Sequence, residues 1–403
     1  MLGLDPLLAG DVDLAVVLIV LLKVVVTFAL LLVSVLFMIW FERKVHADMS
    51  NRLGPNRAGP FGILQTLADG IKFFFKEDLL PDRADKRVFI LAPFLSLVPA
   101  FLVFAVVPIG GVFTEEKQGV VRLFGHDTFL QLADPPIGIL LVLAASSIAV
   151  YGVMLAGWSS GSKYPLLGSV RATAQMVSYE AALALSVLSV VLLAGSLSTH
   201  DIVMTQAGEG FGGLIPRWNL IVTGVVPFVI FLIAATAELN RPPFDLVEAE
   251  QELVGGFHTE YSSIRFALFF LAEFMNVVTM SAIIVTLFLG GPAGPTLFGP
   301  DWIWGPVWFL AKVLVFLFTF VWFRATLPRF RYDQLMDLGW KVLIPLSLGW
   351  LLLLASLNIA RDRDWSTAAV VGAGFAAMVG AYLLLAGAIR TARRRRELGE
   401  VHV

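Results

Sequence analysis

The chain has 403 residues, of which 58% are hydrophobic and only 15% are charged. Ordinary soluble domains carry about a quarter of charged residues, so this composition excludes a water-soluble globular enzyme. The 29 basic and 31 acidic residues nearly cancel, which leaves no basic field for binding nucleic acid. Cysteine is absent, and this excludes disulfides, thiolate-held iron–sulfur clusters, thiolate zinc sites and a cysteine nucleophile.

Nine stretches are apolar enough to cross a membrane as helices, which takes about 20 residues. They are 14–41, 88–108, 136–157, 170–195, 219–237, 263–290, 306–326, 340–359 and 367–389. A transmembrane barrel would alternate apolar and polar residues, and these stretches do not. The acidic start of the chain does not fit a cleaved signal peptide, so the first span is predicted to be permanent. The sequence predicts an all-α polytopic membrane protein.

The distribution of Lys and Arg predicts the orientation of the chain. If the N-terminus lies outside, the inward segments hold 19 bases and the outward loops hold five. Basic residues favour the cytoplasmic side of a membrane, so we expect the N-terminus outside and the C-terminus in the cytoplasm. The basic run Arg393–Arg396 after the ninth span is interpreted as enforcing this topology and contacting anionic lipid.

The first long inward loop, 42–87, combines a defined turn with an amphipathic stretch. Gly54 and Pro55 break the helix. Apolar residues then recur at helical spacing, with charged residues on another face; the apolar ones are Ile63, Leu67, Ile71, Phe74 and Phe75. Two interpretations stay open. The stretch either lies on the lipid surface or packs against a soluble partner or around a ligand entrance.

The second long inward loop, 238–262, is acidic, with Arg241 as its single base. Its six carboxylates belong to Glu238, Asp245, Glu248, Glu250, Glu252 and Glu260. The tandem prolines after Arg241 end the preceding helix, and Asp245 with Glu248 fits a helix capping box. Crowded carboxylates raise one another's pKa, and groups that titrate near neutral pH can pass protons.

Two further carboxylates, Glu180 and Glu273, lie inside predicted spans. Each is about ten residues from the inward end, which is roughly 15 Å into the membrane. A carboxylate at that depth is costly and is normally functional or paired. Glu238 lies at the inward edge of the fifth span, so these residues suggest a polar path from the inner surface to mid-membrane. Lys23 and Lys312, also within spans, are within snorkelling reach of the outer interface.

Sequence patterns typical of cofactor-binding sites are either out of place or missing in this chain. The pattern at 208–213 matches GxGxxG, but no strand precedes it, so it is not a dinucleotide site. None of the five histidines lies in a span, which excludes intramembrane haem ligation. We expect no iron–sulfur cluster, haem, flavin or metal on this chain.

The motifs resemble one family, the H subunit (subunit 1 in mitochondria) of respiratory complex I, the proton-translocating NADH:quinone oxidoreductase. They are Phe41-Glu42-Arg43-Lys44, the turn 52–56, residues 64–77, Ser178-Tyr179-Glu180, and the stretches 238–261 and 324–341. The resemblance implies an eight-helix core over 1–359, in which loops 42–87 and 238–262 form the quinone chamber and the junction with the peripheral arm. Residues 360–403 would add an extra transmembrane helix and a basic cytoplasmic tail.

The resemblance also implies function. The chain would be a multi-pass enzyme subunit without redox centres in a bacterial-type plasma membrane, binding menaquinone or ubiquinone as substrate. Its partners would be lipid, quinone-site subunits of the peripheral arm, the terminal iron–sulfur subunit and small subunits of the proton-pumping arm. Carried over by position, the quinone chamber and junction would include Glu42, Arg43, Arg52, Asp69, Glu77, Arg324, Arg329 and Arg331. The proton path would include Glu180, Glu238, Glu248, Glu250, Glu252 and Glu273.

One departure and two alternatives qualify this interpretation. Some bacterial relatives carry a glutamate in the third span where this chain has Ser147, so a proton path here must use Glu180, a water chain or another route. The homologous membrane subunit of a hydrogenase, or of a dehydrogenase that uses a deazaflavin coenzyme, would share the fold. A stand-alone secondary transporter is a second alternative, although such chains often show two related halves and the sequence shows no internal repeat.

Overall fold

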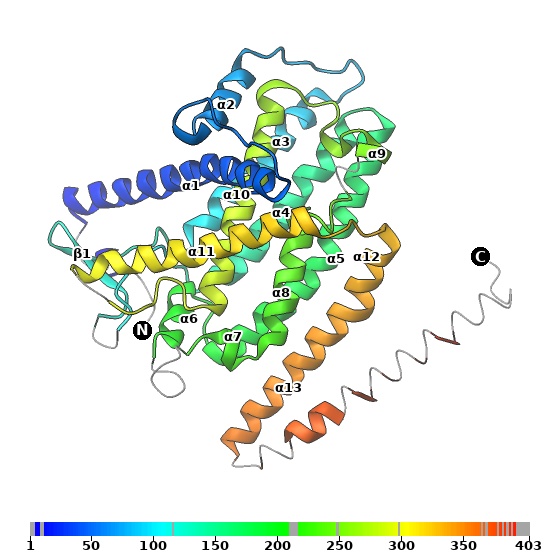
Figure 1. The fold of residues 1–403 in the computed structure, drawn as a ribbon. Helices are drawn as coiled ribbons and strands as arrows, with labels where there is room; N and C mark the ends of the chain where they lie inside the picture. The colour runs from blue at the N-terminus through cyan, green and yellow to red at the C-terminus, as the bar shows by residue number, and fades with distance from the viewer. Residues whose placement is uncertain are drawn as a thin grey trace.

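The computed structural model describes residues 5–8, 12–114, 117–208, 217–246, 250–296 and 299–363, together with 366, 370–376, 379, 380, 383, 387, 390 and 391. Within these ranges, seven helices are long and apolar enough to cross a membrane. They are α1 (Leu14–Met49), α3 (Lys86–Ala105), α4 (Gly138–Ser159), α5 (Lys163–Ala194), α10 (Ser263–Phe288), α11 (Asp301–Thr326) and the continuous run Tyr332–Asp362. The architecture is that of a helical membrane protein (Figure 1), and its orientation stays a prediction.

Two predicted spans differ in their course from the observed helices, and a third cannot be compared with them. The span predicted at 219–237 consists of a short turn, α7 (Asn219–Val222), and a 14-residue helix, α8 (Val225–Glu238). Gly224, with φ of 82°, separates them. The span predicted at 340–359 begins earlier, as α12 (Tyr332–Leu338), a π-helical turn (Gly339–Leu343) and α13 (Ile344–Asp362). Most of the ninth predicted span and the run Arg393–Arg396 lie outside the described residues.

The end of α1 also lies later than predicted. The helix continues to Met49, so Glu42 and Arg43 lie on its last turns and not in a loop. The cause is local, because residues 42–49 contain no glycine or proline and charged side chains are compatible with a helix. Position 42 is therefore held rigidly by a long helix.

Short elements complete the chain. They are α2 (Gln65–Phe75), α6 (Thr199–Gln206), α9 (Glu250–Leu253) and the 3₁₀ turns Pro6–Leu8, Pro60–Gly62 and Gly256–His258. An antiparallel hairpin of β1 (Val120–Leu123) and β2 (His126–Phe129) was not predicted; it pairs Val120 with Phe129 and Leu123 with His126. Strands of four residues give too little alternation to be recognised in an apolar sequence.

Helix α10 is the centre of the bundle. Within its most apolar stretch 72% of the residues are buried, the largest share of the seven helices. It packs against α1, α3 and α11 (Figure 1). A helix that is apolar on every side belongs in a core, and residues 277–288 are buried without interruption. Glu273, one helical turn before this stretch, is therefore held by the most enclosed helix.

The helices α3 and α4 approach each other closely at Gly152. A Cβ atom there would lie 2.7 Å from the backbone nitrogen of Ser96, closer than atoms can approach. Small residues allow this kind of backbone packing between membrane helices. The close approach fixes α4, and with it Ser146 and Ser147, against α3.

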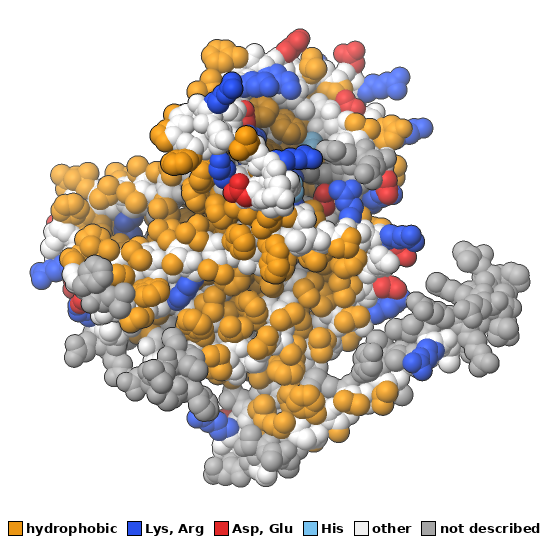
Figure 2. All heavy atoms as spheres, in the orientation of Figure 1, with side chains coloured by type: hydrophobic (Ala, Val, Ile, Leu, Met, Phe, Trp, Pro, Cys, Tyr) orange, Lys and Arg blue, Asp and Glu red, His pale blue; other side chains and the backbone are white. Residues whose placement is uncertain are grey.

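The surface agrees with a membrane protein. Hydrophobic side chains cover the middle of the face shown in Figure 2, while Lys, Arg, Asp and Glu gather at the end where Figure 1 places α2 and α9. The apolar side chains of α2 include Phe74 and Phe75, which are 71% and 87% exposed. The exposed side of α2 thus suits either of the two environments predicted from its periodicity, lipid or a partner.

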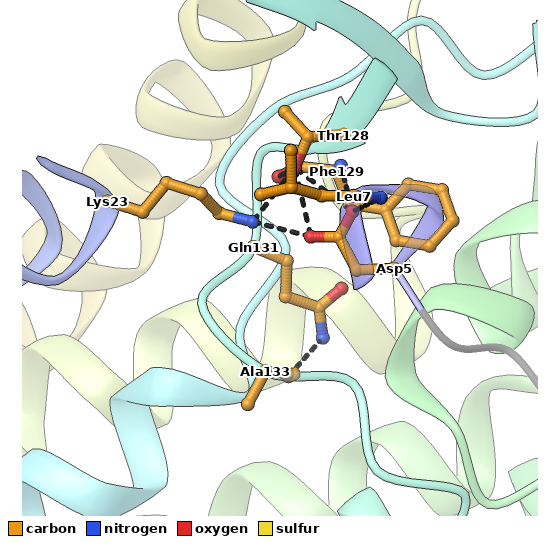
Figure 3. Close-up of polar contacts among 7 residues, drawn as sticks. All are labelled: Asp5, Leu7, Lys23, Thr128, Phe129, Gln131 and Ala133. Carbon is orange, nitrogen blue, oxygen red and sulfur yellow. Dashed lines mark hydrogen bonds and ion pairs between the residues drawn. The ribbon is translucent and has the colours of Figure 1, made fainter. Parts of the chain in front are cut away.

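At the opposite end of α1, Lys23 is paired. Its ammonium lies 2.6 Å from the Asp5 carboxylate and 3.1 Å from the Thr128 hydroxyl (Figure 3). The lysine therefore ties the N-terminal turn to α1 and β2 rather than extending alone to the interface. Lys312 on α11 is also satisfied, because its ammonium donates to the carbonyls of Leu289, Gly291 and Ala293 at 2.8–2.9 Å, just past the end of α10.

The pairing of Lys23 leads to a stability prediction. Lys23→Met leaves the Asp5 carboxylate without its cation, so we expect a loss of about 3 kcal/mol, seen as a lower unfolding temperature of the assembled complex. The double variant Lys23→Met/Asp5→Asn should recover most of this loss. The matched control is Lys117→Met, which breaks an exposed pair with Asp301 and should cost about 1 kcal/mol or less. Equal effects of Lys23→Met and Lys117→Met would show that the buried pair contributes no more than an exposed one.

Candidate functional site

Four charged side chains from four parts of the chain meet at one end of the bundle. Glu42 of α1 accepts from Arg241 Nη1 with both carboxylate oxygens, at 2.9 Å each. Arg324 of α11 also donates to Glu42 Oε1. Arg241 Nη2 lies 3.2 Å from Glu273 Oε1. We call these four residues, Glu42, Arg241, Glu273 and Arg324, the ion cluster.

Burial makes the ion cluster energetically important. The side chains of Arg241 and Glu42 are only 5% and 8% exposed, so each charge depends on its partner. The Arg241 guanidinium also lies 4.7 Å from the centre of the Phe274 ring, a distance typical of a cation–π contact. The cluster joins α1, α10, α11 and the end of α8 through charge.

The Gln175 side chain positions the segment that carries Arg241. It is fully buried on α5, and its amide nitrogen donates to the carbonyls of Ala237 and Phe244 at 2.7 and 2.8 Å. These carbonyls lie on either side of Arg241, and the intervening Pro242–Pro243 peptide bond is cis. One amide group therefore holds both ends of the turn that presents Arg241 to Glu42.

The ion cluster borders a cleft of about 310 Å³. Apolar and charged groups share its walls, namely Ile39, Glu42, Arg43, His46, Phe270, Glu273, Phe274 and Arg324. A pocket with apolar walls and a few polar groups is the usual form of a small-molecule site. Aromatic rings can pack on a flat ligand here, and arginine can donate to its oxygen atoms.

The remaining residues expected at the chamber and junction lie around this end of the molecule. Arg43 pairs with Asp69 of α2 at 2.5 Å. Arg329 pairs with Asp245 at 2.7 Å, so the Asp245 carboxylate binds a neighbouring segment. The capping box predicted from Asp245 and Glu248 would begin a helix here, but the next described helix begins at Glu250. Arg52, Glu77 and Arg331 are exposed. The structure thus brings Glu42 and Arg324 into the ion cluster and leaves these three on the surface.

A second cavity, of about 70 Å³, adjoins the ion cluster through Glu273. Its walls also include Glu238 and His258. Glu238 in turn lines a third, smaller cavity of about 30 Å³, together with Ser146 of α4 and Asn276 and Thr279 of α10. Glu273 and Glu238 are therefore each shared between adjacent cavities, and three cavities follow one another from the cleft into the bundle.

The other carboxylates expected on the proton path have different surroundings. Glu180 of α5 accepts a hydrogen bond from the Ser147 hydroxyl of α4. Glu252 pairs with Arg171 at the surface, at 2.7 Å, and is 64% exposed. Glu248 and the side chain of Glu250 lie outside the described residues. The structure therefore places Glu180, Glu238 and Glu273 inside the bundle and Glu252 outside it.

Sequence reasoning missed Arg241 and His258 as functional candidates. Arg241 stands directly before a helix-ending proline pair, and a single base among six carboxylates is a usable signal that the sequence offers. His258 lies on the 3₁₀ turn Gly256–His258, with its ring against Phe257 and Phe266. Burial lowers the pKa of His258 to about 4, so its imidazole is neutral at physiological pH and can both donate and accept a hydrogen bond.

The comparison with known proteins decides the family. The family described as NADH dehydrogenase matches residues 22–355. The H subunit of NADH-quinone oxidoreductase from Frankia alni is 54% identical over 91% of this chain and 78% of its own length. The corresponding protein of Frankia casuarinae is 53% identical, over 94% and 82%, and that of Streptomyces avermitilis is 50% identical, over 88% and 77%. The chain belongs to the family of NADH-quinone oxidoreductase H subunits.

Membership of this family confirms the resemblance found in the motifs. The chain is a membrane subunit of NADH-quinone oxidoreductase, the multi-subunit enzyme of respiratory complex I. The matched region ends at residue 355, inside α13. Among the described residues, no group of three or more His, Asp or Glu side chains could hold a metal ion.

The burial of the ion cluster leads to the second prediction. Glu42→Gln keeps the shape of the side chain but removes the charge that two guanidinium groups share, so we expect a loss of about 3 kcal/mol in stability. The thermal unfolding of the purified complex measures it. The control variant Asp69→Asn removes the carboxylate of the more exposed Arg43 pair and should cost about 1 kcal/mol or less. A loss for Glu42→Gln no larger than for Asp69→Asn would refute the importance of the buried charge.

The buried His258 predicts a dependence of stability on pH. As the pH falls below the ordinary histidine pKa of 6.5, the unfolded chain binds a proton that the folded chain does not bind until about pH 4. Stability should therefore be complete above pH 6.5 and decline toward pH 4, by about 3 kcal/mol at most. His258→Asn should flatten this part of the curve of unfolding temperature against pH, whereas His46→Asn, at an exposed site, should leave it unchanged. Parallel curves for wild type and His258→Asn would contradict this expectation.

Proposed function

We propose that this chain lines the chamber in which NADH-quinone oxidoreductase binds its quinone, at the junction with the peripheral arm, and that it couples quinone reduction to proton translocation. The electrons come from iron–sulfur groups on partner subunits, because this chain has no cysteine to hold a cluster. Its own residues bind the quinone, compensate charge and carry protons.

One observation carries the proposal. Half-buried carboxylates are shared between neighbouring cavities, with Glu273 between the cleft and the second cavity and Glu238 between the second and the third. A carboxylate that borders two cavities can accept a proton from one side and release it to the other. Carboxylates within membrane proteins commonly mark proton relays.

The cleft at the ion cluster suits a quinone head group. Such a group is a flat ring with two carbonyl oxygens, and the cleft offers the Phe270 and Phe274 rings beside the Arg324 guanidinium. Isoprenoid tails are apolar and fit the hydrophobic surface around the mouth of the cleft. The quinone is menaquinone or ubiquinone, and the chain lies in a bacterial plasma membrane.

Quinone reduction takes two electrons and two protons, so it changes the charge balance beside the cluster. The reduced quinone takes its protons from groups beside it, and Glu273 and Glu238 then take up protons to replace them. Because Arg241 contacts Glu273, the altered charge of Glu273 changes the balance of charge at Glu42. Loop 238–262 carries Arg241. It is the element that would switch between two conformations and so couple quinone reduction to proton translocation.

The partners follow from the same proposal. The exposed α2 and the acidic loop face quinone-site and terminal iron–sulfur subunits of the peripheral arm, and the small membrane subunits of the pumping arm receive the protons. The three relatives are all named as subunits of NADH-quinone oxidoreductase, which favours this enzyme over the hydrogenase alternative.

Glu180→Gln tests the relay. The variant keeps the shape of the side chain but cannot take up and release a proton, so we expect the rate of quinone-linked proton translocation to fall on the order of a hundredfold. The measurement uses the assembled complex in vesicles with a pH-sensitive dye. Electron transfer from NADH to a water-soluble acceptor should stay normal, because it does not involve the membrane path.

The matched control is Asp301→Asn, an exposed carboxylate on α11 that pairs with Lys117. It should keep both activities at the wild-type rate. If Glu180→Gln also retains wild-type quinone reduction and proton translocation, the relay role is wrong.

A further inference from the structure

Two consecutive serines on α4 lie between two of the buried carboxylates. The Ser147 hydroxyl hydrogen-bonds to Glu180 Oε1 on α5. The Ser146 hydroxyl and the Glu238 carboxyl at the end of α8 line the same small cavity, the third one described above. One pair of neighbouring residues therefore lies beside both carboxylates, on a helix that carries no carboxylate of its own.

Each serine also contacts a backbone acceptor, and the two serines share it. Ser146 Oγ lies 2.9 Å and Ser147 Oγ 3.0 Å from the backbone oxygen of Leu143. A serine hydroxyl has one proton to donate and two lone pairs that accept. When its carboxyl partner is protonated, the serine can accept from it and donate to Leu143. When the partner is ionised, the serine can rotate its proton to the carboxylate, without movement of any heavy atom.

The shared carbonyl also brings the two serines together. Because both oxygens contact the same Leu143 atom, they are close enough for one water molecule to bridge them. The third cavity, of about 30 Å³, gives room for a water beside Ser146, and a water needs such polar neighbours to be stable. Among the described residues, Glu238 Oε2 is buried without a hydrogen-bond partner, so it has capacity for a water as well.

The surroundings limit the alternatives at this place. The polar residues that line the third cavity are Ser146, Glu238, Asn276 and Thr279. Asn276 and Thr279 belong to α10, and α3 contributes only Pro99, Ala100 and Val103. The Asn276 amide takes up and releases a proton less readily than a hydroxyl does. Of these polar residues, only Ser146 is next to Ser147, which contacts Glu180.

We propose that Ser146 and Ser147 are proton-carrying hydroxyls that join Glu238 to Glu180, in place of a third-span carboxylate. The proposal rests on the proton path proposed above and supplies its missing connection. The Glu238 carboxyl passes its proton to Ser146 Oγ while the Ser146 hydroxyl gives its own proton to a bridging water. The water gives a proton to Ser147 Oγ, and the Ser147 hydroxyl gives its own to Glu180 Oε1. In total one proton moves from Glu238 to Glu180, and no electron is transferred. Rotation of the two hydroxyls then returns their protons to the original orientation.

Serine variants of the assembled complex test the proposal. Ser146→Ala and Ser147→Ala should each slow quinone-linked proton translocation about tenfold or more, with unchanged electron transfer to a water-soluble acceptor. Ser147→Thr keeps a hydroxyl and should retain the wild-type rate. Ser147→Glu supplies a carboxylate instead and should translocate protons faster than Ser147→Ala. The matched control is Ser189→Ala, which removes a buried hydroxyl on α5. Among the described residues this hydroxyl donates to the Leu185 carbonyl of its own helix, so the variant should translocate protons at the wild-type rate.

An infrared measurement separates a proton carrier from a packing residue. The carboxyl band that disappears in Glu180→Gln reports the Glu180 side chain. Ser147→Ala should shift this band, because the carboxyl loses its hydrogen-bond partner, whereas Ser189→Ala should not. A shift in both variants, or in neither, would overturn the assignment.

Two kinetic outcomes overturn the proposal and are distinguishable from failure of the proposed function. If Glu180→Gln stops translocation but Ser146→Ala/Ser147→Ala keeps the wild-type rate, the relay stands and the hydroxyl bridge is wrong. If Ser147→Thr is as slow as Ser147→Ala, packing and not the hydroxyl is responsible, and the bridge is again wrong. If Glu180→Gln itself is silent, the relay and the bridge both fall.

Discussion

The buried pair between Glu42 and Arg241 is the interaction on which the candidate site depends. The two side chains are almost fully enclosed and come from positions 199 residues apart. Neither charge is tolerable at that depth without the other. The pair therefore fixes the end of α1 to the turn after α8, and Glu273 and Arg324 extend it to α10 and α11. Where the four elements meet, the cleft opens.

Ion pairs with other elements hold the acidic loop beside the membrane domain. Arg241 binds Glu42, Arg329 binds Asp245 and Arg171 binds Glu252. Each of these acids has a basic partner on another element, and only Arg241 comes from the loop itself. Inside the bundle, Glu180 accepts a hydrogen bond from Ser147, and Glu238 shares a cavity with Ser146. Basic side chains thus hold the loop in place, while hydroxyls lie near the two carboxylates proposed to exchange protons.

Hydropathy predicted the membrane class and most helices, because the cost of exposing backbone to lipid leaves little choice of structure. Hydropathy misplaced the end of α1 and the beginning of α12, because charged residues continue these helices beyond the apolar stretch. It also predicted one span where Gly224 separates α7 from α8. The four-residue strands left no periodic signal. These errors concern boundaries, where the apolar pattern stops being informative.

The candidate site was predicted unevenly for a different reason. Glu180, Glu238 and Glu273 could be singled out because charges near or within apolar spans are conspicuous, and Glu42 and Arg324 because they match motifs of the family. Their partners could not, because Arg241 meets Glu42 and Ser147 meets Glu180 only through helix neighbours that one sequence does not reveal. In the sequence Ser147 stands out only as a missing carboxylate, and its hydrogen bond to Glu180 depends on the packing of α4 against α5.

The ammonium of Lys312 has a consequence for the direction of proton movement. It caps the far end of α10, where aligned peptide dipoles would otherwise present partial negative charge, and it binds three carbonyls there. This fixed positive charge takes the place of an attractive helix end. For the proton path proposed above, it disfavours an exit along the central helix and favours one sideways from Glu180, toward a neighbouring subunit.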